Sequence, residues 1–147
     1  MMTSFTKVAA LLIAAHLIFS QISAIAFSDK EWASLLDEAK KGDVEAQWTL
    51  GCIYADGLHR PKNDAEAVKW TRKAAAQGHT DAQISLATIY ELGIGVPKNA
   101  VEAYAIFNIV GNKDALESRD RIAKKMTPEQ IAGAKKRTKE LEKEFKK

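Results

Sequence analysis

The chain has 147 residues, of which 46% are hydrophobic and 28% charged, a globular composition that excludes a disordered or fibrous chain. This length suits one domain with a real core. The formal net charge of +3 is too near neutral to demand a nucleic-acid partner, and we expect none.

The first 26 residues have the pattern of a secretory signal peptide. Lys7 precedes an apolar run over residues 8–15, and small and polar residues follow as far as Ala26. We predict cleavage after Ala26 and a mature protein that is periplasmic or secreted, without stable membrane insertion. An uncleaved anchor is the alternative, but a spanning helix needs about 20 predominantly apolar residues, and polar residues such as His16 interrupt this stretch.

The predicted mature domain, residues 27–147, begins with an expected N-terminal capping helix over 27–41. Ser28 and Glu31 have the spacing of a capping box that starts a helix. One side of this helix is apolar and holds Trp32, Leu35, Leu36 and Ala39. We expect it to supply the second helix of a layer that precedes the first repeat.

The chain then matches itself at a shift of 36 residues. The matched positions include Gly42 and Gly78, Leu50 and Leu86, Tyr54 and Tyr90, Gly57 and Gly93, and Pro61-Lys62-Asn63 and Pro97-Lys98-Asn99. A period of this length is typical of stacked supersecondary units. We assign the first repeat to residues 42–77 and the second to residues 78–110.

Each unit is predicted to form a helix, a turn and a second helix. In the first unit Ala46, Leu50 and Tyr54 are four residues apart and share one helix face, and Ala82, Leu86 and Tyr90 repeat this spacing. The glycines at 57 and 93 can end the first helices, and the prolines at 61 and 97 prevent their continuation.

The second helix of each unit is expected to begin with a capping box and to carry small residues. Asn63 and Glu66 form the first box, and Asn99 and Glu102 form the second. Trp70 is the one large residue on the small-residue side of its helix, so we expect it to fill the gap between layers. We predict a continuous core seam formed by Leu50, Tyr54, Trp70, Leu86 and Tyr90.

This pattern resembles the Sel1-like repeat. The matching residues include Gly42, Ala46, Leu50-Gly51, Tyr54, Gly57, Ala67, Trp70, Ala74-Ala75, Gly78 and Gly93-Ile94-Gly95-Val96. The tetratricopeptide repeat is the nearest alternative, but its period of about 34 residues does not fit. The resemblance covers about residues 38–131 and implies an all-α solenoid of antiparallel helix pairs in a right-handed superhelix, with a role as an adaptor or interaction scaffold.

Three departures from the repeat bear on the structure. His59 stands where the second turn has Gly95, so the same turn would require positive φ at histidine, which tolerates it better than most residues. The spacing from Gly78 to Gly111 is 33 residues, which predicts that the second unit's last helix is three residues shorter. Ile106 occupies the place of the expected tryptophan.

Residues 111–147 are expected to form a degenerate helical cap. One helix is predicted over about 113–126, and Thr127-Pro128-Glu129-Gln130 starts another. The mature chain should therefore contain seven helices. Residues 119–147 carry 11 basic and 5 acidic side chains, a run that is usually a solvated helix face, with an anionic lipid, nucleic acid or acidic partner as the alternative.

No pattern in the sequence indicates catalysis. His59 and His79 lack metal-ligand spacing, and we expect both to be solvated surface residues. Cys52 is the only cysteine and lies in an apolar helical pattern, which favours a structural role over a reactive thiol or a cross-link to a partner. Because Gly93-Ile94-Gly95 recurs with the repeat, it predicts a turn and not a phosphate loop. We predict no enzyme activity, no metal and no cofactor.

Binding is the remaining class of function, and a solenoid offers a concave face made by the first helix of each pair. Trp48 and Ile84 hold equivalent places about 200° around their helices from Ala46 and Ala82, so they are candidates for contact with a partner. The alternative is that both pack against a neighbouring helix.

The leading hypothesis is an exported scaffold or adaptor that binds another protein of unknown identity. An inhibitor or immunity-type protein that blocks an exported toxin or hydrolase is a second hypothesis. A hydrolase related to cysteine-rich relatives of this repeat is a third, but the paired cysteines of that subgroup are absent.

Overall fold

The computed structural model describes residues 28–57 and 59–145. The predicted signal peptide and its cleavage site lie outside these residues. The chain divides into two compact units, Met1–Trp32 and Ala33–Lys147, and the arrangement below is that of the second unit.

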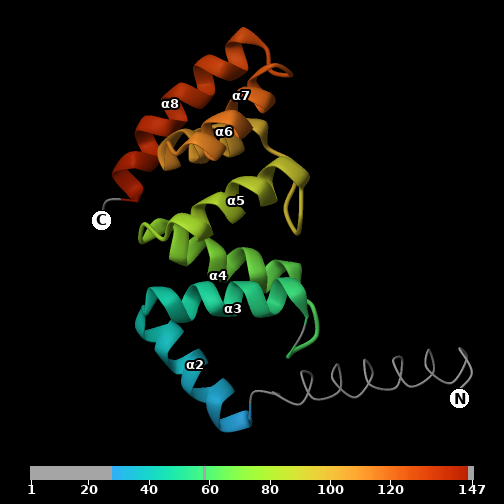
Figure 1. Ribbon diagram of the computed structural model, residues 1–147, viewed down its shortest axis with the longest axis vertical. Coiled ribbons are helices and arrows are strands. Elements are labelled where there is room, and N and C mark those ends of the chain that lie inside the picture. The colour runs from blue at the N-terminus through green and yellow to red at the C-terminus, as the bar shows by residue number, and fades with distance from the viewer. Residues whose placement is uncertain (1–27, 58, 146–147) are drawn as a thin grey trace, which may run out of the picture. The chain divides into compact units, whose positions relative to one another are not determined.

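Seven α-helices and no strands make up the secondary structure of the described residues, which confirms the predicted all-α class and helix number (Figure 1). The helices are α2 (Asp29–Lys41), α3 (Val44–Asp56), α4 (Asp64–Ala76), α5 (Thr80–Leu92), α6 (Ala100–Val110), α7 (Lys113–Ala123) and α8 (Pro128–Glu144). None of these helices is long and apolar enough to cross a bilayer.

The repeated turn residues end α3 and α5 as expected. Gly57 and Gly93 adopt left-handed backbone conformations, with φ of 70° and 76°. Each turn then closes through the cap asparagine of the next helix: the Asn63 N–H donates to the Tyr54 carbonyl at 2.9 Å, and Asn99 repeats this bond. The asparagine side chains cap α4 and α6.

Two details of these turns differ from the prediction. Both asparagine capping boxes are only half formed, because the Asn63 and Asn99 N–H groups donate to carbonyls within the turns. The Glu66 carboxylate accepts instead from Lys69 and the Trp70 indole, and the Glu102 carboxylate accepts from Arg137. The expectation of positive φ at His59 is wrong, since no described residue other than glycine has positive φ.

Gly95 explains why the second turn keeps its extra glycine. It has φ of 66°, and a Cβ atom there would lie 2.9 Å from the Asp64 carbonyl oxygen at the start of α4. Close approach and backbone conformation therefore both favour glycine.

Each helix from α3 to α6 packs against the next one along the chain, and α8 returns to pack against α6 (Figure 1). A buried glutamine repeats between layers. The Gln47 side chain donates to the Ala39 carbonyl at the end of α2, and the Gln83 side chain donates to the Ala75 carbonyl at the end of α4, both at 3.0 Å. The last turn of α2 is therefore bound to the first repeat in the way that α4 is bound to the second.

Small residues dominate the core and let the helices approach closely. Leu50, Trp70 and Leu86 are almost fully buried, whereas Tyr54 and Tyr90 are half-buried. The Tyr90 hydroxyl accepts a hydrogen bond from Arg72 at 2.8 Å, so its ring packs on the core while its polar end reaches the surface.

The second repeat compensates for its missing tryptophan. Ile106 takes the buried place of Trp70, and Phe107 beside it is also buried. Helix α6 has 11 residues, whereas α4 has 13. The last helix of the second repeat is therefore shorter, as predicted, but by two residues and not by three.

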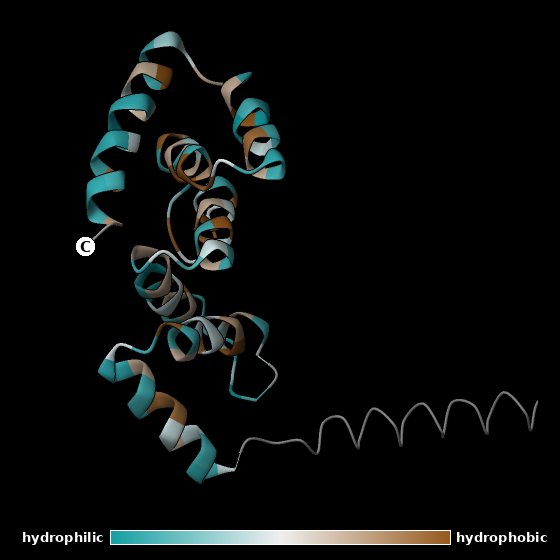
Figure 2. Ribbon diagram, turned by 60° about the vertical axis from the view of Figure 1, so that its left-hand side comes forward, coloured by the Kyte–Doolittle hydropathy of each residue, from teal (hydrophilic) through white to brown (hydrophobic). Residues whose placement is uncertain are grey.

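The C-terminal helix is largely hydrophilic and docks through a narrow face (Figure 2). Ala134, Thr138 and Leu141 are buried. Arg137 lies beside them and donates to Glu102 of α6 at 2.7 Å and to Glu144 at 3.0 Å. Desolvation opposes its charge, but hydrogen bonds to Glu144 and Glu102 outweigh this and raise the pKa of Arg137.

Candidate functional site

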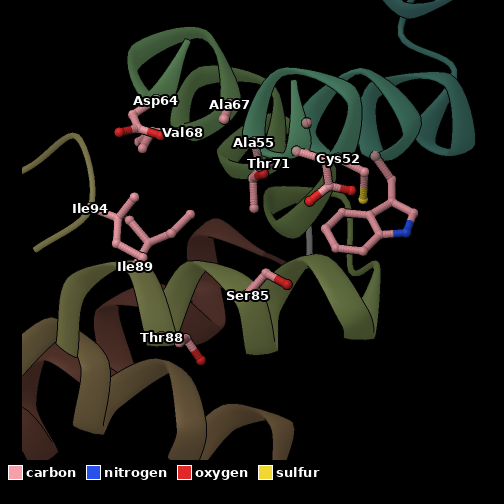
Figure 3. Close-up of a pocket in the computed structure, with 13 residues that line it drawn as sticks. Cys52, Ala55, Asp64, Ala67, Val68, Thr71, Ser85, Thr88, Ile89 and Ile94 are labelled. Carbon is pink, nitrogen blue, oxygen red and sulfur yellow. The ribbon is translucent and has the colours of Figure 1, made fainter. Parts of the chain in front are cut away.

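Two neighbouring grooves open on the side of the first helices. The first groove has a volume of about 300 Å³ and runs between α3, α4 and α5 (Figure 3). Its lining residues are Trp48, Gly51, Cys52, Ala55, Asp56, Asp64, Ala67, Val68, Thr71, Ser85, Thr88, Ile89 and Ile94. Most of this lining is apolar, which is the usual character of a binding site.

The second groove, of about 250 Å³, is the equivalent place one repeat further on. Trp48, Cys52, Ala55 and Asp56 of the first groove correspond at a shift of 36 residues to Ile84, Thr88, Glu91 and Leu92 of the second. Thr88 lines both grooves, so they adjoin across α5. Among the residues that the structure describes, Leu92 is the most exposed large hydrophobic one, with 54% of its surface accessible.

Trp48 and Ile84 line the first and second grooves respectively. Both are half-buried and also pack partly against the core. Each side chain therefore combines the two predicted alternatives, exposure to a partner and packing against a neighbouring helix. Their role in binding stays a prediction. Leu50, Leu86 and Trp70 line neither groove and serve the core.

Sequence reasoning missed the groove floors. Thr71 lies in the floor of the first groove, and Phe107 holds the equivalent place in the second. The smaller side chain leaves the first groove more open. A comparison of positions where the two repeats differ would have pointed to this pair.

The charges of the two grooves also differ. Of the described residues, those that line the first groove include the carboxylates of Asp56 and Asp64 and no cation, whereas the second contains the carboxylates of Glu91 and Asp114 together with Arg121, which forms an ion pair with Glu91. Burial raises the pKa of the Cys52 thiol, and the negative charges of Asp56 and Asp81 raise it further.

The Sel1 repeat family model matches residues 44–79 and 80–108, which are the two helical hairpins that form these grooves. The chain belongs to the Sel1-like repeat family.

Solved structures agree with this assignment. A protective antigen present in uropathogenic Escherichia coli strains, described as displaying an SLR fold, is 31% identical over 85% of this chain, with a TM-score of 0.74. A Sel1 repeat protein from Oxalobacter formigenes is 36% identical over 58% of this chain, with a TM-score of 0.55. This chain covers 29% and 36% of those two proteins. No curated protein matched the sequence.

Sel1-like repeats are generally scaffolds for protein–protein interaction, and the fold is an all-α solenoid of helix pairs. In this Sel1-like repeat protein the described residues contain no group of three or more histidine, cysteine or carboxylate side chains placed to hold a metal ion.

His79 has a structural role that the sequence interpretation missed. Its side chain is only 13% exposed, so the expectation of a solvated histidine is wrong. Its Nδ1 accepts from the Ala82 N–H at 3.2 Å and caps α5, its Nε2 lies 3.4 Å from Glu45, and its ring centroid lies 5.3 Å from that of Trp48. The equivalent caps at α3 and α7 are Asp43 and Asn112.

Two substitutions at this Sel1-like repeat position should separate its cap from its ring contact. His79→Ala removes both, whereas His79→Asn keeps an N-cap acceptor and removes only the ring. Because losing an N-cap costs about 0.5–2 kcal/mol, we expect the alanine variant to be less stable than the asparagine variant by that amount. Urea denaturation measures the difference, and equal stabilities would exclude a capping role.

Proposed function

We propose that the mature chain is an exported, non-catalytic scaffold that binds one partner protein across the first and second grooves. One observation carries the proposal: the repeat places Trp48 and Ile84 at equivalent points of adjoining, largely apolar grooves. Half-buried aromatic and aliphatic side chains in such positions are typical anchors for a partner. The family's general scaffold role supports the same function.

Site-specific photocross-linking tests the surface. A photoreactive residue at Thr88, which lines both grooves, should capture a partner in extracts of the cell envelope. The same group at Lys135, exposed on α8, is the control. A product from position 88 that is absent from position 135 supports groove binding, and products from position 135 alone would contradict it.

Trp48→Ala should then weaken binding of the captured partner. Truncation of an aromatic anchor typically costs more than about 1 kcal/mol and up to about 4 kcal/mol of binding free energy. Titration of the purified partner measures this loss, and Lys135→Ala provides the control. Because Trp48 also packs on His79, a melting curve must show that the variant is folded; unchanged affinity in a folded variant would remove Trp48 from the site.

Export is proposed from the N-terminal pattern. Mass spectrometry of the protein from the envelope fraction should find Phe27 at the N-terminus, and an intact Met1 would contradict cleavage.

A further inference from the structure

The two helices that present Trp48 and Ile84 contain acidic residues and no basic ones. Helix α3 carries Glu45 and Asp56, and helix α5 carries Asp81 and Glu91, while neither has a lysine or an arginine. Four carboxylates therefore lie on these helices without a cation from the same helices to balance them.

Two of the four carboxylates already have a partner. Glu91 is paired with Arg121 across the second groove, and Glu45 lies beside His79. The ion pairs between described residues include neither Asp56 nor Asp81. Of the four, the two without an ion pair to another described residue are therefore Asp56, which lines the first groove, and Asp81, which lies one helical turn before Ser85 of that lining.

Both of these carboxylates lie close to Cys52, because Asp56 is one helical turn after it on α3 and Asp81 is one turn before Ser85, which lines the same groove on α5. Cys52 lines the first groove between Trp48 and Asp56 along α3, and both Asp56 and Asp81 act electrostatically on its thiol. Carboxylates at the edge of a concave, apolar wall produce a stronger field than the same groups on an open surface.

We propose that the first groove binds a cationic segment of the partner protein, with an apolar side chain on the floor beside Trp48 and a lysine or arginine opposite Asp56 and Asp81. The apolar lining favours an apolar side chain over a simple ion. The two carboxylates favour a positively charged residue next to that side chain in the partner. This inference rests on the proposed function and names the chemistry of the partner. The second groove should discriminate less, because the cation Arg121 lines it beside its two carboxylates and pairs with Glu91.

The sign of the field can be measured without any partner, because Cys52 is the only thiol in the chain. Cys52 can be modified with two methanethiosulfonate reagents, one carrying a cationic trimethylammonium group and the other an anionic sulfonate group. Because both reagents react with the same thiolate, the thiolate fraction cancels in the ratio of the two modification rates. Relative to the same ratio for the urea-unfolded protein, we expect the folded protein to favour the cationic reagent by about 2- to 10-fold at low salt.

Charge variants locate the source of that ratio. Asp56→Asn and Asp81→Asn should each lower it towards the unfolded value, and the double variant should remove the preference. Glu142→Gln, an exposed change on α8, is the matched control and should leave it unchanged. A folded ratio equal to the unfolded one, or a preference for the anionic reagent, overturns the inference.

Peptide protection tests the occupant. A short blocked peptide in which lysine alternates with leucine and phenylalanine should protect Cys52 from iodoacetamide at a concentration about 2- to 10-fold lower than its glutamine counterpart. The glutamate counterpart should protect least. The lysine advantage should shrink at high salt and in the double asparagine variant.

The remaining outcomes separate the two proposals. Equal protection by the lysine and glutamine peptides overturns the charge preference and leaves groove binding intact. Protection by spermidine at the same concentration as the lysine peptide overturns a protein segment as the occupant. If no peptide protects Cys52 while cross-linking from position 88 still captures a partner, the inference fails and the proposed function stands. If both fail, neither groove is the binding surface.

Discussion

Replacing Trp70 with alanine should lower the free energy of unfolding by about 3–5 kcal/mol, because the indole is 3% exposed and its removal leaves a large cavity in the core. The indole N–H also donates to Glu66 at 3.0 Å, and the ammonium of Lys73 lies 4.6 Å from the ring centroid. Urea denaturation followed by circular dichroism measures the loss.

Two further variants make this prediction specific. Trp70→Phe keeps most of the apolar volume and should cost clearly less than the alanine change. Lys135→Ala, exposed on α8, should stay within about 0.5 kcal/mol of the wild type. A loss of less than about 1 kcal/mol for Trp70→Ala would mean that the tryptophan does not hold the layers together, and the repeat interpretation of the core would be wrong.

The repeat and its helices were predictable because they depend on local signals. Gly57 and Gly93 end helices through their own backbone conformation, and Asn63 and Asn99 cap helices through hydrogen bonds to residues two or three positions away. Such signals are written within a few residues of the place where they act. The shift of 36 residues then showed each signal twice.

The grooves were less predictable because they depend on distant residues. The floor of each groove is formed by a residue on the second helix of the pair, Thr71 or Phe107, and periodicity along the first helix does not reveal which residue faces it. Helical spacing did select Trp48 and Ile84. It could not show that each side chain would pack partly against the core and partly line a groove.

His79 shows a similar limit. A lone histidine at a helix start is most often solvated, and the Nδ1 cap and the contact with Trp48 are tertiary features. The differences between repeats carried the missing information: the caps Asp43, His79 and Asn112 occupy the same structural place with three different side chains.

The repeats also differ at one helical glycine, and this difference predicts a second large effect. Gly51 of α3 lies against α4, and a Cβ atom there would be 2.6 Å from the Thr71 hydroxyl oxygen and 3.3 Å from its backbone nitrogen. Its counterpart in the second repeat is Ala87, opposite Phe107. The first repeat therefore has a smaller residue on both sides of this contact.

Gly51→Ala should destabilise the protein although alanine is the better helix former. Forcing a methyl group into this contact costs about 1–3 kcal/mol, which outweighs or cancels the gain of about 1 kcal/mol in helix propensity. Gly133→Ala is the matched control, because it makes the same change in α8 with no atom within 4 Å of the new Cβ. We expect that control to gain about 0.5–1 kcal/mol.

A double-mutant cycle assigns the difference to Thr71. In a Thr71→Ala background the hydroxyl oxygen is gone and only the backbone contact at 3.3 Å remains, so Gly51→Ala should cost less there than in the wild type. Equal effects of the change at Gly51 and Gly133 would show that α3 and α4 do not approach closely at this point. Equal costs in the two backgrounds would show that the Thr71 hydroxyl is not the cause. Because Gly51 and Thr71 both line the first groove, the same close approach sets the shape of the floor on which a partner would bind.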